Sequence, residues 1–261
     1  MKVLQILPQL NIGGVERGTL DLSKALIHKG HESFVISGGG ILVDELEQLG
    51  AKHYEIPVHI KSLRTLSLAK SLSETISSID PDIVHIRSRM PAWVNYRAFK
   101  MLQKKPLLVS TFHGLYSFPI YSKVMSFVDH SIAISKTVES YILENYKLDK
   151  NDITVIPRGC DPVEFNNDEI NSDDKAEIIN EFPQIVGKTV LTIPGRITKW
   201  KGVAEFIELL SLLDDNYHGL IVGPTAKSKK KYLNKLQNKV SSLDLENKIT
   251  FTGSRRDIAN I

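Results

Sequence analysis

The residues with the clearest chemical potential are Arg196, Lys199 and Lys201, which fall within the segment PGRITKWKG at positions 194–202. This segment follows an apolar run typical of a buried strand and precedes a stretch with the spacing of an amphipathic helix. Backbone N–H groups at the start of a helix attract anions, and cationic side chains strengthen that attraction. The pattern therefore predicts a site for a phosphate or diphosphate, with a loop of solvated cations as the alternative.

Gly13 and Gly14 lie between the first predicted strand, 3–7, and the first predicted helix, 15–29. In a doubly wound sheet this loop lies at the edge where ligands bind, and glycines let the backbone approach a ligand closely. The spacing is not Gly-x-Gly-x-x-Gly, which counts against an NAD or FAD site, and a tight turn explains both glycines equally well. Glu16 would repel a diphosphate, so we expect it to serve the helix dipole or an acceptor hydroxyl.

Three further candidates end predicted strands at the same edge. His113 follows the apolar run 107–112, where a neutral imidazole could share a hydrogen bond with a sugar hydroxyl; the alternative is a histidine satisfied by nearby backbone. Arg87 and Arg89 suggest an anionic acceptor or the lining of a cleft, against the alternative of a solvated loop. His85 points inward in the strand pattern, so we expect it to be structural.

Two other groups are expected to have no catalytic role. The lysine-rich run 227–231 opens a predicted helix and is expected to be a solvated face, with a basic patch facing anionic lipid as the alternative. Cys160 is expected to be a small buried residue rather than a nucleophile, because no histidine is close to it in the sequence.

Composition sets the broad class. The chain has 261 residues, 42% hydrophobic and 24% charged, as in ordinary soluble globular proteins. The net charge of +3 is too small to indicate nucleic-acid binding, and a single cysteine excludes an internal disulfide framework and a cysteine metal cluster. The sequence shows no signal peptide and no apolar run long enough to span a membrane. We therefore expect a cytoplasmic protein, with attachment to the inner face of the membrane left open.

Strand and helix patterns alternate along the chain, which predicts an α/β fold with parallel sheets covered by helices on both faces. A polar, turn-rich passage interrupts this alternation after residue 157. The predicted organisation is a Rossmann-like domain over 1–165, a linker over 166–183, and a partial second domain over 184–261. The second domain has only three predicted strands and falls short of the usual ~100–150 residues, so we expect an incomplete polypeptide.

Seven motifs occur in a fixed order along the chain. They are GGVE at 13–16, FHG at 112–114, IS at 134–135, VIPRGCD at 155–161, PGR with KG at 194–196 and 201–202, LIVG at 220–223, and FTG at 251–253. The ordered set resembles the family-4 glycosyltransferases of the GT-B fold, which have two facing Rossmann-like domains. Residues 85–93 and 114–116 also resemble the branch that acts on bacterial lipopolysaccharide core.

The resemblance implies transfer of a sugar with retention from a nucleotide-sugar donor to a cell-surface glycan or lipid-linked acceptor, without a catalytic metal or other cofactor. Arg196 and Lys201 would grip the donor diphosphate, and His113 would contact the transferred sugar. Gly13 and Gly14 would place backbone amides near the diphosphate. The residues implied near the nucleoside are Gly223, Phe251, Thr252 and Gly253. The residues assigned to the acceptor side are Glu16, Arg87 and Arg89.

The chain departs from the family at its C-terminal end. Family members carry, further on, a spaced pair of glutamates that hold the donor, and this sequence stops at Ile261 before that segment. We therefore expect a C-terminally truncated chain with impaired or lost transfer activity. A sugar-nucleotide epimerase of the same fold and a non-catalytic nucleotide-binding fragment are the alternatives.

Overall fold

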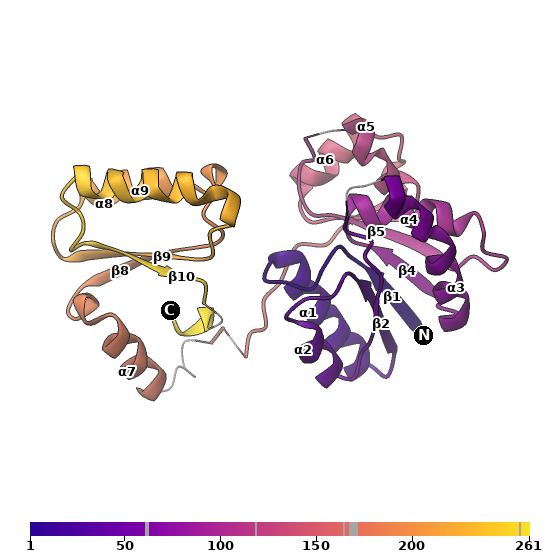
Figure 1. Ribbon diagram of the computed structural model, residues 1–261, viewed down its shortest axis with the longest axis horizontal. Coiled ribbons are helices and arrows are strands. Elements are labelled where there is room, and N and C mark those ends of the chain that lie inside the picture. The colour runs from indigo at the N-terminus through magenta and orange to yellow at the C-terminus, as the bar shows by residue number, and fades with distance from the viewer. Residues whose placement is uncertain (61–62, 118, 164, 167–171, 256) are drawn as a thin grey trace. The chain divides into compact units, whose positions relative to one another are not determined.

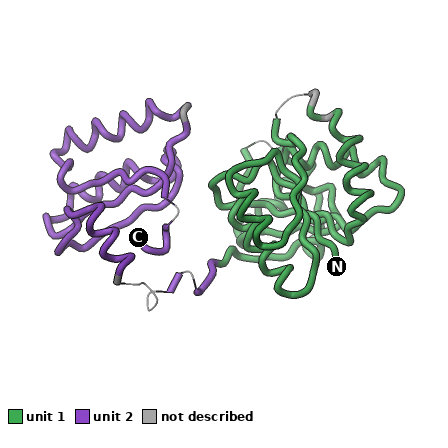
Figure 2. Tube along the Cα trace, turned by 60° about the horizontal axis from the view of Figure 1, so that its bottom comes forward, with its two compact units in different colours: residues 1–159 green, residues 160–261 purple. Residues whose placement is uncertain are grey.

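The computed structural model describes residues 1–60, 63–117, 119–163, 165–166, 172–255 and 257–261. The chain divides into two compact units, Met1–Gly159 and Cys160–Ile261 (Figure 2). Each unit has its own sheet and its own core, and each is described below by itself.

Unit 1 is built on a parallel sheet with the strand order β3-β2-β1-β4-β5-β6-β7 (Figure 1). The chain runs outward from β1 in one direction and then returns to add β4 on its other side, so the strand order reverses between β1 and β4. In open α/β sheets, ligands bind beyond the carboxyl ends of the strands at this point of reversal. The strands are β1 (Lys2–Ile6), β2 (Glu32–Ser37), β3 (Lys52–Glu55), β4 (Ile83–Ile86), β5 (Leu107–Phe112), β6 (His130–Ala133) and β7 (Ile153–Val155).

Helices cover both faces of this sheet, and alternate residues of a strand enter different cores. Phe34 and Ile36 of β2 join the larger core with α3 and α4, whereas Val35 packs with Leu20 of α1 and Leu46 of α2. The helices are α1 (Gly14–His28), α2 (Val43–Gln48), α3 (Ala69–Ile79), α4 (Arg89–Phe99), α5 (Pro119–Ser122) and α6 (Lys136–Asn145). Short 3-10 helices are η1 (Leu63–Leu68), η2 (Lys123–Ser126) and η3 (Lys150–Asp152).

Unit 2 is built on a three-stranded parallel sheet with the order β10-β9-β8. Helices α8 and α9 cover one face, and α7 lies on the other (Figure 1). The core under α8 and α9 contains Ile207, Leu210, Ile221, Leu236 and Val240. The elements are α7 (Ser172–Glu181), η5 (Pro183–Ile185), β8 (Thr189–Pro194), η6 (Lys199–Lys201), α8 (Val203–Leu212), β9 (Tyr217–Val222), η7 (Lys227–Lys229), α9 (Lys230–Ser242), β10 (Ile249–Gly253) and η8 (Ile258–Asn260).

Helix α7 corrects the predicted linker. Part of the range 166–183 lies outside the described residues, but 172–181 form a helix, with Ile178 and Phe182 buried against unit 2. Arg255 near the chain's end pairs with Glu181 at 2.6 Å and stacks on the Phe182 ring. The acidic residues that suggested a turn sit in the first helical turn, where they complement the helix dipole. This segment is therefore part of unit 2 rather than a linker.

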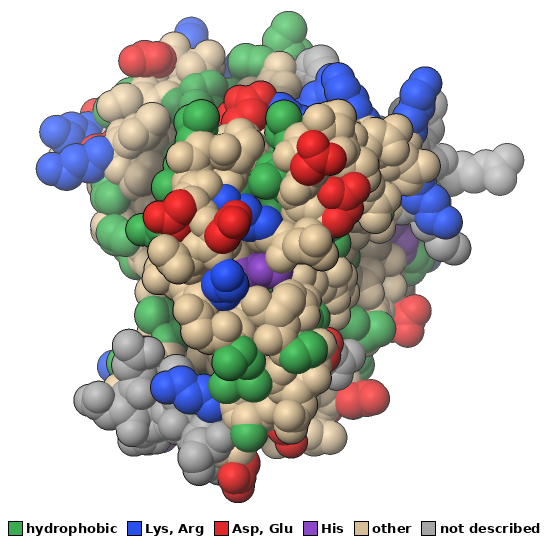
Figure 3. Space-filling view, turned by 90° about the vertical axis from the view of Figure 1, so that its left-hand side faces the viewer, with side chains coloured by type: hydrophobic (Ala, Val, Ile, Leu, Met, Phe, Trp, Pro, Cys, Tyr) green, Lys and Arg blue, Asp and Glu red, His purple; other side chains and the backbone are tan. Residues whose placement is uncertain are grey.

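The other predicted elements are found within a few residues of their expected bounds, with two exceptions. The residue pattern predicts one helix over 63–79 and one over 120–128. The first range instead forms η1 followed by α3, and the second forms the short α5 followed by η2. Among the described residues no helix is long and apolar enough to cross a membrane. On the face drawn in Figure 3, acidic and basic side chains are interspersed, in keeping with 33 Lys and Arg against 30 Asp and Glu.

Candidate functional site

The first candidate site lies in unit 1, where β1 and β4 end side by side. Ile6 pairs with Ile86 at the last position of the shared register, and the chain then continues from β1 toward α1 and from β4 into Arg87. Gly13 is the N-cap of α1 and has no side chain to bond the free N–H groups of the first turn. The predicted placement of Gly13, Gly14 and Arg87 near one edge is therefore observed.

Arg87 is buried, with only 6% of its surface exposed, so the alternative of a solvated loop is wrong. Its Nη1 donates a 2.8 Å hydrogen bond to Gln5 Oε1 in the neighbouring strand β1. Gln5 Nε2 in turn donates to the Thr19 carbonyl at 3.1 Å and to Ser23 Oγ at 3.0 Å, both on α1. This buried network holds the guanidinium under α1. Its Nε is buried and has no hydrogen-bond partner in the described part of the chain.

Arg158, just after β7, also lies at the carboxyl ends of these strands, beside Gly14. Sequence reasoning missed it as a site residue. Its guanidinium donates through Nη1 to the Gly14 carbonyl and through Nη2 to His113 Nδ1 at 3.1 Å. A Cβ on Gly14 would lie 3.1 Å from Arg158 Nη1, so the glycine allows this close approach. Arg158 belongs to the VIPRGCD motif and follows a strand end, which is the signal that could have found it.

The contact with Arg158 fixes the protonation of His113. Because a guanidinium only donates, Nδ1 must accept, and the neutral ring then carries its proton on Nε2. Burial, with the positive charges of Arg87 and Arg158, lowers the pKa of His113 to about 3. The ring is thus a neutral hydrogen-bond donor at physiological pH. Its Nε2 is buried and has no partner among the described residues.

The other predicted residues of unit 1 have structural contacts. Glu16 lies against Gly13. Arg89 is half-buried, with its guanidinium carbon 4.8 Å from the centre of the Tyr116 ring and 5.5 Å from that of Tyr121. His85 is structural as predicted: it is buried, and its Nε2 lies 2.7 Å from Thr111 Oγ1.

The second candidate site lies in unit 2, where the backbone ties three strand ends together. The Gly195 N–H donates to the Val222 carbonyl and the Gly223 N–H donates to the Gly253 carbonyl, each at 2.7 Å. Gly223 has a φ of +148°, and a Cβ there would collide with the Gly195 carbonyl, so only glycine fits. The predicted donor residues Gly223, Thr252 and Gly253 are therefore brought to the same edge as Gly195.

The cationic segment leaves this edge and leads into α8. Arg196 and Lys201 are both exposed, and Lys201 Nζ lies 4.5 Å above the ring of Trp200, which is 71% exposed. Gly202 has a φ of +76° and is the N-cap of α8, with no side-chain cap for its free N–H groups. Thr198 Oγ1, in the same segment, is a buried hydroxyl without a partner in the described residues. This arrangement can bind an anion through backbone and side-chain donors.

Some predicted residues do not contribute a side chain to either site. Phe251 is partly buried and packs against the core of unit 2. Cys160 is exposed, so the prediction of a small buried residue is wrong. In the lysine-rich run, residues 228–231 are exposed, as expected of a solvated face.

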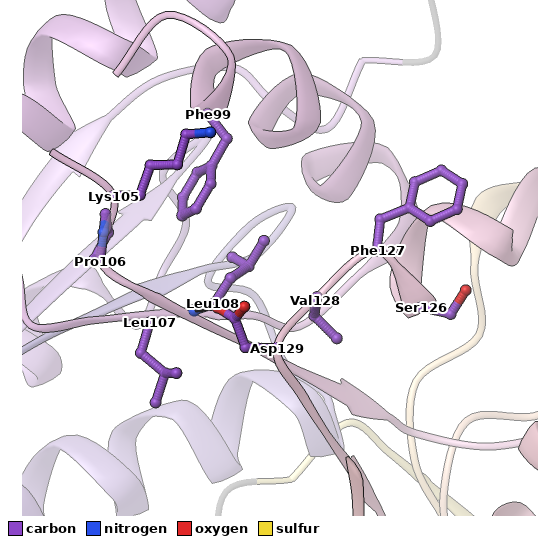
Figure 4. Close-up of a pocket in the computed structure, with 9 residues that line it drawn as sticks. All are labelled: Phe99, Lys105, Pro106, Leu107, Leu108, Ser126, Phe127, Val128 and Asp129. Carbon is purple, nitrogen blue, oxygen red and sulfur yellow. Dashed lines mark hydrogen bonds between the residues drawn. The ribbon is translucent and has the colours of Figure 1, made fainter. Parts of the chain in front are cut away.

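A cavity of about 580 Å³ in unit 1 lies where β5 and β6 begin (Figure 4). It is lined by Leu107 and Leu108 at the start of β5 and by Val128 and Asp129 just before β6. Asp129 Oδ2 accepts a 2.8 Å hydrogen bond from the Leu108 N–H, so its carboxylate serves the sheet. Since ligands of such sheets bind at the carboxyl ends of strands, this cavity is not the candidate site.

Residues 12–164 match the profile of Glycosyltransferase Family 4, and residues 174–261 match that of Glycosyl transferases group 1. The chain therefore belongs to glycosyltransferase family 4. An uncharacterized glycosyltransferase of Methanocaldococcus jannaschii is 32% identical over 148 residues, which cover 50% of this chain and 36% of that protein. The matched segment thus spans little more than a third of this relative's length.

Solved structures agree with the family. A glycosyltransferase from Rickettsia africae is 33% identical and superposes with a TM-score of 0.84, covering 99% of this chain and 69% of that one. HepE of Anabaena, in complex with UDP and glucose, is 20% identical with a TM-score of 0.85, covering 100% of this chain and 71% of that one. The predicted α/β fold of the GT-B type is confirmed, and this chain spans about 70% of the length of these two solved chains.

Proposed function

We propose that this chain binds a nucleotide-sugar donor for glycosyl transfer and that the cationic edge of unit 2 holds the donor's diphosphate. The observation that carries the proposal is the meeting of Gly195, Gly223 and Gly253 beside exposed Arg196 and Lys201 at the uncapped start of α8. A diphosphate is an acceptor-only anion, and this edge offers backbone N–H groups and two cations. Membership of the family supports the same assignment.

Transfer of the sugar leaves negative charge on the departing diphosphate oxygen. Arg196 and Lys201 can neutralise that charge as it develops, and losing one such donor costs about 10²–10³ in rate in other enzymes. With two cations in this role, we propose that the reaction needs no divalent metal. His113, held neutral with its proton on Nε2, would donate a hydrogen bond to a sugar hydroxyl rather than act as a base.

The finer assignments are proposals as well. We propose transfer with retention of the anomeric configuration, by a hexosyltransferase that acts on a cell-surface glycan or lipid-linked acceptor, such as lipopolysaccharide, at the cytoplasmic face of the membrane. A similar structure, of 14% identity and TM-score 0.71, is a glycosyltransferase involved in lipopolysaccharide biosynthesis, and this supports the fold but not the acceptor.

The test is calorimetric binding of UDP-glucose to the full chain. Arg196→Ala should weaken binding at least tenfold, because the guanidinium is an exposed, charged donor beside the proposed diphosphate position. Lys199→Ala is the matched control, since Lys199 is an exposed cation in the same segment and should change affinity less than about twofold. Chelation with EDTA should leave the affinity unchanged.

Three outcomes would count against the proposal. Binding by Arg196→Ala equal to that of the parent chain would remove the proposed diphosphate site. Loss of binding after chelation would contradict the metal-free assignment. Conversion of the donor to an epimer in the absence of any acceptor would favour an epimerase.

A further inference from the structure

Two guanidinium groups in unit 1 lie close together under the first turns of α1. A Cβ placed on Gly18 would lie 3.2 Å from Arg87 Nη2 and 3.5 Å from Arg158 Nη1, so both groups approach the same point. Gly14 and Gly18 are four residues apart and share one face of α1, which is the face that the two arginines cover. Glycine at both positions leaves the room that the guanidiniums occupy.

No carboxylate pairs with either arginine in the described part of the chain. The two acidic side chains that act on them electrostatically are Glu16 and Asp21. Asp21 forms an ion pair with Arg17 at 3.5 Å, and Glu16 lies against Gly13. The repulsion between the two cations is therefore not balanced by a bonded counterion.

The burial of Arg87 makes this arrangement costly. A buried charge without an ion pair is strongly destabilising in general, and a buried donor without an acceptor adds to the cost. Arg87 has both, because its single neutral partner is Gln5 and its Nε has none in the described residues. Burial and the charge of Arg158 lower the pKa of Arg87 to about 10, which still leaves it charged at neutral pH. A buried unpaired donor in a native structure needs an explanation, and a bound anion that supplies the missing acceptor is one such explanation.

We propose that Arg87 and Arg158 form an anion-binding site within unit 1, at the point where the strand order reverses between β1 and β4, and that the site takes a phosphoryl group. A phosphoryl group has several acceptor oxygens and up to two negative charges, which match two guanidiniums and the uncapped start of α1. A carboxylate would balance only one of the two cations. The site is built from residues of unit 1 alone, and only the case in which the nucleotide supplies the phosphoryl group rests on the proposed function.

Two sources could supply this group: a phosphate on the acceptor, or the diphosphate of the nucleotide. The test uses the full chain labelled with ¹⁵N and the arginine Nε–Hε signals in NMR. The signal of Arg87 is identified by its loss in Arg87→Lys. Addition of inorganic phosphate should shift this signal saturably, because the orphaned Nε–H gains an acceptor or a nearby negative charge.

Arg158→Gln is the decisive variant, since Arg158 is exposed and its replacement should leave the fold intact by circular dichroism. It should weaken phosphate binding at least fivefold. Arg97→Gln removes another exposed arginine of unit 1 and should leave the affinity unchanged. If phosphate leaves the Arg87 signal unmoved, or if Arg158→Gln binds phosphate as the parent chain does, the site does not exist.

UDP distinguishes the two sources. If the nucleotide supplies the group, UDP should shift the Arg87 signal and Arg158→Gln should weaken UDP and phosphate to the same extent. If the acceptor supplies it, phosphate should still shift the signal in the UDP-saturated protein. Failure of Arg196→Ala to affect UDP-glucose binding would refute the proposed function and leave this anion site standing.

Discussion

The two units place positive charge at the carboxyl edge of a parallel sheet in opposite ways. In unit 1 the cation is a buried side chain, Arg87, fixed by Gln5 and a polar network under α1. In unit 2 the cations are exposed, and it is the backbone that is fixed, through the hydrogen bonds of Gly195 and Gly223. In unit 1 the position of the Arg87 guanidinium is therefore fixed before a ligand binds. In unit 2 only the backbone is fixed, and the side chains of Arg196 and Lys201 extend from it into solvent.

The difference has an energetic consequence. A preset cation loses little conformational entropy on binding, but its burial destabilises the free protein. An exposed cation costs the fold nothing and must be ordered when the ligand arrives. Substitution of the buried Arg87 in unit 1 should therefore change both stability and binding, while side-chain substitutions of the exposed cations in unit 2 should change binding alone.

The largest expected effect is on Arg87. Arg87→Ala relieves the cost of the buried charge, but it leaves a large cavity and deprives Gln5 Oε1 of its donor. Because the cavity and the lost hydrogen bond outweigh that relief, we expect a net loss of about 3 kcal/mol in the free energy of unfolding. Arg196→Ala, at an exposed position, should change it by less than about 0.5 kcal/mol. Urea unfolding of both variants measures the contrast. Equal midpoints would show that the buried network contributes nothing to unit 1.

A second test compares glycines, because unit 2 relies on its backbone. Gly223→Ala should lower the unfolding free energy by about 2–3 kcal/mol, since its φ is +148° and the new methyl group meets the Gly195 carbonyl. Gly18→Ala in unit 1 brings a methyl group to 3.2 Å from Arg87 Nη2, so the guanidinium must shift by a few tenths of an ångström. The gain in helix propensity offsets part of this cost, and stability should change by less than about 1 kcal/mol. Gly159→Ala, with open space around it, is the control.

The third test uses pH. Burial lowers the pKa of His85 and His113 in unit 1, and burial likewise lowers that of His218 in unit 2. The unfolded chain takes up protons below pH 6.5 that the folded chain refuses, so stability is full above that pH and falls as the pH drops. For His113 the loss extends toward pH 3, at no more than about 1.4 kcal/mol per pH unit.

Unit 1 holds more of these histidines, so it should unfold first on acidification. Trp93 lies in unit 1 and Trp200 in unit 2, which lets fluorescence follow each unit in the Trp200→Phe and Trp93→Phe variants. His113→Gln should flatten the pH dependence of unit 1 between pH 7 and 5. If the two units lose structure at the same pH, the buried histidines do not set their acid sensitivity.

The sequence predicted the strands of both units and the cationic segment of unit 2, but it did not predict the arginine cluster of unit 1. Apolar runs predicted the strands of both sheets, and the glycines and cations at 194–202 predicted the candidate anion site of unit 2. Both predictions were possible because a strand, a turn and the start of a helix are local patterns. The role of Arg158 could not be predicted this way, since its partners Gly14 and His113 are distant in the chain. The burial of Arg87 depends on Gln5 in another strand. Helix α7 was missed because turn-forming and helix-starting residues are the same types.

The smallest expected effect concerns Trp200, whose ring lies under Lys201 Nζ. Unit 1 has a similar cation–π contact, in which the half-buried Arg89 lies over the rings of Tyr116 and Tyr121. A cation–π contact at an exposed site contributes about 0.5–1 kcal/mol, and here it restricts the lysine before the ligand arrives. Trp200→Ala should therefore weaken UDP-glucose binding by about two- to fivefold and leave stability unchanged. Trp200→Phe keeps a ring and is the control.

Calorimetry of these two variants decides between opposite roles for the contact. If the ring presets Lys201, Trp200→Ala binds more weakly and Trp200→Phe lies close to the parent chain. If the lysine must leave the ring to reach the diphosphate, the contact competes with the ligand and Trp200→Ala binds more tightly. Tighter binding would mean that the Trp200 ring holds Lys201 Nζ away from the diphosphate position in the free protein. Lys201 would then have to move to bind its ligand, whereas Arg87 in unit 1 is already in place.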